Sequence, residues 1–345
     1  MTIEEDFPGL PPFPKDVKTF PVPILSWGKL LAEDKIESER MFEACKDQGV
    51  FQLNLGDTPK GRDLLADVDD VFSVSKDLFN VDVEEKERYK MSAKTTFGYK
   101  GVGKIVIDDK GTPDRNEFFA ISKDEMFGNT DAAPTLDIVN ANKRLLRSYM
   151  SSAHEVVITV LSALETHLHL PRNTLVDIHR LSEIDGNQTR LFLYSPQPSS
   201  DRRTSLVPHT DFGSVTVLFN RLGGLQILPS NHGGAEAAAA AEWAYIRPLP
   251  SHAIVNMGDA LVKFTHGLLK SLVHRVTYAP GAQASVPRYS MVYLARPSND
   301  VILKRLEGSD VIPPLDEGEV EEDISSADWI ANRVREHHYG TSEGT

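Results

Sequence analysis

The chain has a single cysteine, Cys45, among its 345 residues, which excludes an internal disulfide. Nothing in the sequence therefore indicates a disulfide-stabilised secreted scaffold. Cys45 lies in a segment with helical spacing, and we interpret it as a small buried apolar residue rather than a nucleophile. We accordingly expect a cytoplasmic location.

Basic clusters and long apolar runs are also missing. The formal net charge is −13 and Lys and Arg form no basic run, so we expect no nucleic-acid partner. No apolar run approaches the roughly 20 residues that span a bilayer, and the acidic, proline-rich start does not resemble a signal peptide, so we expect no membrane partner. A composition of 40% hydrophobic and 25% charged residues is typical of a globular protein with a sizeable core.

The first half of the chain predicts mostly helices. Apolar residues recur at helical spacing in three segments, at 34–48, 64–79 and 137–169. The last of these should brace a sheet from outside. Alternating patterns predict short strands at 21–25 and 51–55, the second with one buried face. Residues 95–122 are rich in glycine and should be irregular; their GYKGVG lacks the GK[ST] ending of a phosphate-binding loop.

After Asn187 the apolar pattern changes to period two, which indicates strands. The predicted strands are 189–194, 214–219, 225–228, 243–247, 252–256, 272–279 and 287–296. Strands of this length with glycine-rich turns suggest a sandwich or a jelly roll. We interpret residues 230–242 as an enlarged hairpin loop and the acidic run 316–323 as solvated. Residues 327–340 predict a helix that packs on the body or closes over a pocket.

Candidate metal ligands lie in this second half. His209 and Asp211 are two residues apart, so on a strand both side chains point to one side. A third ligand must come from elsewhere, and His274 in SLVHRV is the candidate, although a lone histidine in an apolar strand is often a packed core residue. Two imidazoles and one carboxylate are the usual set in non-haem Fe(II) enzymes that activate oxygen.

A second pair, Arg288 and Ser290, has the same spacing in the run PRYSMVYLA. An arginine fork matches a carboxylate with two parallel hydrogen bonds, and a neighbouring hydroxyl adds a third. An inward-facing arginine beside a metal would be costly unless an anion neutralised it. We therefore expect this pair to bind the acid group of a substrate or co-substrate.

Several motifs follow one another in a fixed order: RxxxYxP, HxDxGxxTxL, GGLQ, NxGDxL, KSxxHRV and RxS. With them, the C-terminal half resembles the Fe(II)- and 2-oxoglutarate-dependent oxygenases, in the branch that includes isopenicillin N synthase. The resemblance implies that His209, Asp211 and His274 are the iron ligands. It also implies that Arg288 and Ser290 bind the C5 carboxylate of 2-oxoglutarate and that Tyr194 reaches its C1 end.

The resemblance implies a fold that is mainly β with flanking helices (α+β), around a double-stranded β-helix or jelly-roll core. That core would span residues 186–300. A mostly helical region with a few strands, 1–185, would precede it, and an acidic segment with a helix, 301–345, would follow.

The substrate pocket is expected to involve aromatic side chains. Phe192 and Phe212, together with Leu218, are candidates for an apolar wall. In relatives the 95–122 region lies over the iron site, so Tyr99, Lys100 and either Phe118 or Phe119 are further candidates. Phe192 stands where the family often has Asn, which leaves the substrate identity open.

The expected activity is oxidation of an unactivated C–H bond of a small organic substrate by hydroxylation, desaturation or cyclisation, in secondary metabolite biosynthesis. The implied cofactor is Fe(II), with 2-oxoglutarate and O₂ as co-substrates and ascorbate as an assay additive.

One alternative is an iron oxidase that does not use 2-oxoglutarate, as in isopenicillin N synthase or ACC oxidase. Another is a non-catalytic jelly-roll protein with a vestigial or zinc-filled site. A zinc hydrolase is disfavoured because no Glu base accompanies the ligands as in HExxH. The sequence does not indicate the oligomeric state.

Overall fold

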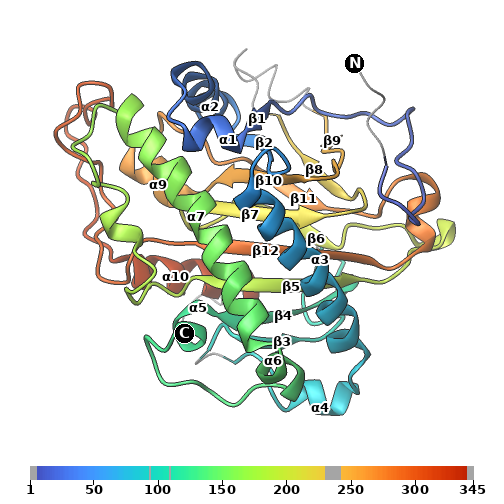
Figure 1. Ribbon diagram of the computed structural model, residues 1–345. Coiled ribbons are helices and arrows are strands. Elements are labelled where there is room, and N and C mark those ends of the chain that lie inside the picture. Colours follow the sequence, from blue (N-terminus) through green and yellow to red (C-terminus); the bar gives the residue numbers. More distant parts are fainter. Residues whose placement is uncertain (1–5, 93–94, 109, 230–241, 340–345) are drawn as a thin grey trace.

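Two β-sheets form the centre of the protein in the computed structural model, which describes residues 6–92, 95–108, 110–229 and 242–339 (Figure 1). The larger sheet has the strand order β1-β2-β10-β7-β12-β5-β4-β3. Its strands are β1 (Ile24–Ser26), β2 (Val50–Asn54), β3 (Gly98–Lys100), β4 (Asn116–Ser122), β5 (Gln188–Tyr194), β7 (Val215–Asn220), β10 (His252–Met257) and β12 (Arg288–Ala295). The smaller sheet, ordered β6-β11-β8-β9, contains β6 (Leu206–His209), β8 (Leu225–Ile227), β9 (Ala244–Tyr245) and β11 (His274–Val276).

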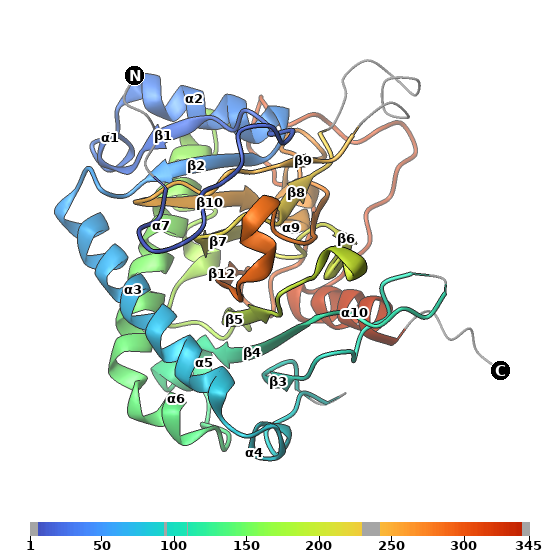
Figure 2. The ribbon, with the colours of Figure 1, turned by 90° about the vertical axis from the view of Figure 1, so that its right-hand side faces the viewer.

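The long helices cover the outer face of the larger sheet. In chain order the helices are α1 (Trp27–Leu31), α2 (Lys35–Asp47), α3 (Pro59–Asn80), α4 (Val83–Glu87), α5 (Lys123–Phe127), α6 (Asp137–Ala141), α7 (Lys143–His167), α9 (Asp259–Phe264) and α10 (Ser326–Tyr339). Figure 2 shows α3 and α7 on one side of the larger sheet and the smaller sheet on the other. No helix among the described residues is long and apolar enough to cross a membrane.

The alternation of side chains along each strand divides the core into two parts. On β12, Met291 and Tyr293 pack with the helices, whereas Val292 faces the smaller sheet. The interior between the sheets contains residues of both, among them Leu218 of β7 and Ile227 of β8. Apolar packing thus fixes the separation of the two sheets, which is the geometry of a jelly roll.

The predicted long helices are present and their ends have clear causes. The Thr58 side chain accepts a hydrogen bond from the Gly61 amide and caps α3, whose first residue is Pro59. α7 buries a stripe that includes Leu146, Met150, Val157 and Leu161. This stripe packs against β7 and β12, so α7 braces the sheet from outside as predicted.

Several sequence predictions need correction. β2 is buried on both faces, since Val50 packs between the sheets and Phe51 against the helices. The region expected to be irregular contains β4, which pairs with β5 over its whole length. Its run NEFFAIS lacks alternation because both of its faces are covered, with Phe118 inside and Phe119 among the helices. The predicted hairpin loop falls largely on residues 230–241, which lie outside the described residues.

Candidate metal centre

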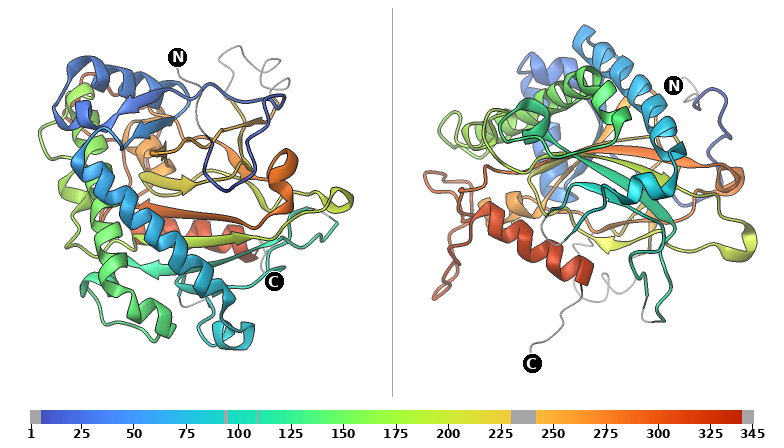
Figure 3. Two further views of the ribbon diagram at one scale, coloured as in Figure 1. Left: turned by 45° about the vertical axis from the view of Figure 1, so that its right-hand side comes forward. Right: turned by 90° about the horizontal axis from the view of Figure 1, so that it is seen from below.

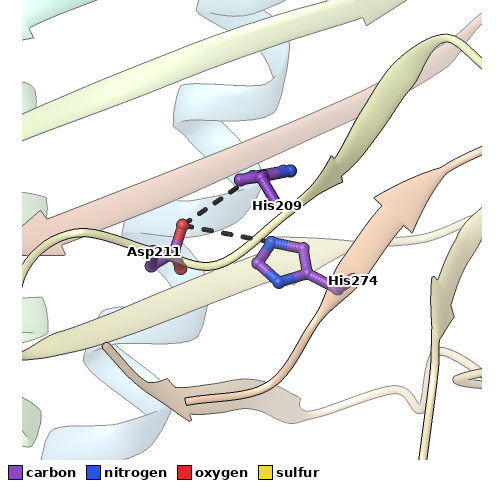
Figure 4. A group of neighbouring side chains, drawn as sticks. All are labelled: His209, Asp211 and His274. Atoms are coloured by element: carbon purple, nitrogen blue, oxygen red, sulfur yellow. Dashed lines mark ion pairs between the residues drawn. The ribbon is translucent and has the colours of Figure 1, made fainter. Parts of the chain in front are cut away.

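Two histidines lie side by side on neighbouring strands of the smaller sheet. His209 ends β6, His274 begins β11, and the two are direct partners in the antiparallel register. Their ring centroids are 4.3 Å apart. Asp211 lies just beyond the end of β6, and its Oδ1 is 4.0 Å from Nε2 of His209 and 3.9 Å from Nε2 of His274 (Figure 4). One atom from each side chain therefore meets the other two within 4.8 Å.

The backbone fixes which nitrogen of each imidazole is free. Nδ1 of His209 is 2.8 Å from the Val207 carbonyl oxygen, and Nδ1 of His274 is 3.0 Å from that of Leu272. A carbonyl oxygen only accepts, so each Nδ1 carries the hydrogen and donates it. Each Nε2 is thereby left to face Asp211, and it is the nitrogen that would bind a metal.

The larger sheet holds the carboxylate in place. Thr216 Oγ1 on β7 and Asn256 Nδ2 on β10 donate to Asp211 Oδ2 at 2.6 and 2.7 Å. Oδ1 is thereby left to face the histidines. Burial alone would raise the pKa of Asp211, but the two histidines and the two hydrogen bonds together bring that pKa below its ordinary value. The carboxylate is thus ionised and ready to coordinate a cation.

Two glycines allow the loop after Asp211 to pack this closely. A Cβ at Gly213 would lie 2.4 Å from the Ala295 carbonyl oxygen. A Cβ at Gly258 would lie 2.2 Å from the Gly213 carbonyl oxygen and 2.9 Å from that of Asp211. Only a residue without a side chain fits at these contacts, so the glycines position the ligand loop against β12 and α9.

A buried arginine forms a second functional group at one end of β12. Arg288 is 3% exposed, its Nε donates to the Gly223 carbonyl oxygen at 2.7 Å, and one terminal nitrogen lies 3.3 Å from Ser290 Oγ. No Asp or Glu of the described residues pairs with it. Burial lowers the pKa of Arg288, because its charge has left water without gaining a carboxylate partner. The site therefore suits a carboxylate ligand.

Tyr194 belongs to the same group. It is the cross-strand partner of Arg288, whose guanidinium lies 4.7 Å from the centre of the Tyr194 ring. Burial raises the pKa of Tyr194, while the Arg288 charge and hydrogen bonds with Ser290 and Arg288 act in the other direction. The resemblance implied that Tyr194 reaches the C1 end of 2-oxoglutarate. The register instead places it with the residues expected at the C5 end.

A cavity between the sheets connects these groups. Its walls include the predicted Phe192, Phe212, Leu218 and Phe118 as well as the three candidate ligands. Val334 of α10 also lines it, and Trp329 Nε1 of the same helix donates to the Phe212 carbonyl oxygen at 3.2 Å. The C-terminal helix therefore packs beside the cavity, on the side opposite α3 and α7 (Figure 3).

Tyr99 and Lys100 do not line this cavity, contrary to the prediction. Strand alternation turns Tyr99 toward the helices, where its hydroxyl donates to Glu117 at 2.6 Å. Lys100 faces the other way, but its ammonium group pairs with Asp114 and donates to the Asn116 carbonyl oxygen at 2.7 Å. Both side chains have polar partners of their own, and these contacts attach the edge strand β3 to the rest of the protein.

Four polar residues of this site were not predicted from the sequence. Thr216 and Asn256 orient the carboxylate, while Arg190 and Arg296 line the cavity. Three of them fall within motifs, so the motifs carried a signal for them: Arg190 in RxxxYxP, Thr216 in HxDxGxxTxL and Asn256 in NxGDxL. A further group, His266, Asp316 and Glu319, also has its ligand atoms within 4.8 Å of one another, but its two carboxylates are exposed.

Comparisons with known proteins agree with this geometry. The family model of the 2OG-Fe(II) oxygenase superfamily matches residues 185–297, and one described as "non-haem dioxygenase in morphine synthesis N-terminal" matches residues 22–139. The chain is 36% identical to a 2-oxoglutarate-dependent dioxygenase of Aspergillus fumigatus over 337 residues, covering 94% of this chain and 88% of that protein. It is 30% identical to codeine O-demethylase of Papaver somniferum, covering 74% and 67% respectively.

Solved structures share the fold. A full-length protein of Neurospora crassa, crystallised in complex with alpha-KG, aligns with a TM-score of 0.74 at 22% identity, covering 91% of this chain and 95% of that one. JOX2 in complex with 2OG, Fe and JA aligns with a TM-score of 0.68 at 21% identity, covering 95% and 88%. The predicted fold, strand-rich sheets with flanking helices around a jelly-roll core, is thereby confirmed.

The hydrogen bond from Thr216 yields a test of how the carboxylate is oriented. Thr216→Val removes the hydroxyl at nearly constant volume, so affinity for Fe(II) should fall about 10- to 100-fold. Competition with a fluorescent chelator under anaerobic conditions measures this change. Thr189→Val is the matched control, because that buried hydroxyl has no hydrogen-bond partner. Equal Fe(II) affinity in Thr216→Val and the wild type would contradict the orienting role.

Proposed function

The chain belongs to the 2-oxoglutarate- and Fe(II)-dependent oxygenase superfamily, and we propose that His209, Asp211 and His274 hold its iron. The observation that carries this proposal is the convergence of both Nε2 atoms on Asp211 Oδ1, at 4.0 and 3.9 Å. Two neutral imidazoles and one carboxylate match the ligand set of non-haem Fe(II) oxygenases and leave further coordination positions for co-substrate and O₂.

The enzyme is a dioxygenase that uses Fe(II), 2-oxoglutarate and O₂ to oxidise a small organic substrate. When bound, the iron and 2-oxoglutarate supply the oxidising chemistry, and 2-oxoglutarate is converted to succinate and CO₂. The alternative of an oxidase without 2-oxoglutarate is not supported, since the curated relatives include several named 2-oxoglutarate-dependent dioxygenases. Because these relatives are enzymes, the alternative of a non-catalytic metal-binding jelly-roll protein is not supported either.

The side chains of this protein would divide the remaining work. We assign the C5 carboxylate of 2-oxoglutarate to Arg288, Ser290 and Tyr194, which replaces the expectation that Tyr194 binds the C1 end. The Arg288 fork would give two parallel hydrogen bonds, and burial would strengthen them. Phe192, Phe212 and Leu218 would exclude water from the reacting carbon and shape the substrate pocket.

We also propose a role in secondary metabolite biosynthesis. The N-terminal family model is described with reference to morphine synthesis, and one relative is a codeine O-demethylase. The single buried cysteine supports a cytoplasmic location, where a reducing environment would help to keep the iron ferrous. The apolar cavity walls favour a small organic substrate over a macromolecule.

Release of succinate tests the proposed function. Protein loaded with Fe(II), with ascorbate in the buffer, should form succinate from 2-oxoglutarate when a library of small organic compounds contains a substrate. Asp211→Ala should lose both bound iron and succinate formation, because two histidines alone leave the cation without its charged ligand. Iron content is measured by mass spectrometry of the metal and succinate by chromatography.

Asp316→Ala is the control for this experiment. Asp316 belongs to the other group of a histidine and two carboxylates, so its loss should leave iron content and succinate unchanged. Stoichiometric Fe(II) in Asp211→Ala, or its loss in Asp316→Ala, would show that the iron is held elsewhere.

Arg288→Lys tests the binding of 2-oxoglutarate. Lysine keeps the positive charge but lacks the planar fork, so the KM for 2-oxoglutarate should rise about 10- to 100-fold while iron content stays constant. Arg275→Lys on β11 is the matched control, since Arg275 bonds to Gln226 Oε1 at 2.9 Å and does not line the cavity. An unchanged KM in Arg288→Lys would refute the assignment.

A further inference from the structure

Two arginines besides Arg288 line the same cavity. Arg190 lies on β5, and Arg296 directly follows β12. The period of two residues places Arg190 on the face of β5 that carries Phe192 and Tyr194, which is the inner face. Both guanidinium groups therefore belong to the interior between the sheets and not to the outer surface of the protein.

The contacts of these arginines leave much of their hydrogen-bonding capacity unused. Nε of Arg190 donates to Gln188 Oε1 at 3.1 Å, and its guanidinium lies 5.0 Å from the centre of the Phe118 ring. One terminal nitrogen of Arg296 donates to the Gly186 carbonyl oxygen at 3.0 Å. Within the described part of the chain, neither arginine forms an ion pair with Asp or Glu. Each guanidinium is held by one hydrogen bond and still presents further N–H groups.

The charges of the two guanidinium groups are poorly compensated. Burial lowers the pKa of Arg190 and of Arg296 to about 10, and the Arg190 charge contributes to the lowering at Arg296. Asp211 acts in the opposite direction on both, but this carboxylate would be shared with the metal. Two like charges in an apolar cavity are unfavourable unless an anion joins them.

These arginines are separate from the residues assigned to 2-oxoglutarate. Along β5, Arg190 pairs with Val292, whereas Tyr194 pairs with Arg288. The two positions are four residues apart, which corresponds to about 13 Å along a strand. The rings of Phe118, Phe192 and Tyr194 lie in a row between the two guanidinium groups, so a carboxylate held by Arg288 is separate from one that contacts Arg190.

We propose that Arg190 and Arg296 bind the carboxylate of the substrate, which is a small organic acid with an apolar body. This inference rests on the proposed function. Phe118 and Gln188 hold the Arg190 guanidinium in a fixed orientation, so its outer edge is prepared for a planar acid group. Phe192, Leu218 and Val334 would contact the apolar remainder.

Acids and their neutral amides distinguish this proposal from simple hydrophobic binding. Cinnamate, 4-phenylbutyrate and decanoate, each with its primary amide, are titrated by calorimetry into anaerobic enzyme that holds Fe(II) and saturating 2-oxoglutarate. At least one acid should bind about 10- to 100-fold more tightly than its amide, the size expected for charge-assisted hydrogen bonds. Arg190→Gln and Arg296→Gln should each reduce or remove this preference.

The affinity for 2-oxoglutarate is the internal control, and it should stay unchanged in Arg190→Gln. That variant is the decisive one, because Arg296 also supports the backbone at Gly186. Equal affinities for every acid and its amide, a preference that survives in Arg190→Gln, or acid binding that weakens as 2-oxoglutarate increases would overturn the proposal. Failure of the wild type to bind 2-oxoglutarate would instead contradict the proposed function and, with it, this inference.

Discussion

The site depends on the position of the Asp211 carboxylate, which contacts residues of both sheets. Asp211 is held through Oδ2 by Thr216 and Asn256 of the larger sheet, while its Oδ1 faces the two histidines of the smaller sheet. The three donor atoms converge only because apolar packing between the sheets fixes their separation. A close-packed interior tolerates little displacement, so the same packing that stabilises the fold also sets the positions of these three atoms.

The cavity between the sheets has mostly apolar walls, and three arginines, Arg190, Arg288 and Arg296, give it positive charge. Rings connect the guanidinium groups of Arg190 and Arg288: Phe118 and Phe192 lie 5.2 Å apart between centroids, and Phe192 and Tyr194 5.8 Å apart. Both arginines lie at the ends of this row, 5.0 and 4.7 Å from the nearest ring centre. Rigid rings thus keep the two guanidinium groups apart, as the proposal that each binds a different acid requires.

The sequence predicted the parts of this arrangement that depend on local spacing. Period two identified β5, β7, β10 and β12, and it placed Arg288 and Ser290 on one face. Register between distant strands could not be derived in this way, so the pairing of His274 with His209 and of Tyr194 with Arg288 required the structure. β4 was missed because a strand buried on both faces shows no alternation. Arg190 is the first residue of the RxxxYxP motif, whereas Arg296 carries no local pattern that separates it from surface arginines.

Anomalous diffraction at the iron edge, from crystals grown anaerobically with Fe(II), tests the central claim most directly. The account predicts one strong iron peak at about 2.0–2.2 Å from Nε2 of His209, Nε2 of His274 and Oδ1 of Asp211. An iron peak at His266, Asp316 and Glu319 with none between the sheets would contradict it.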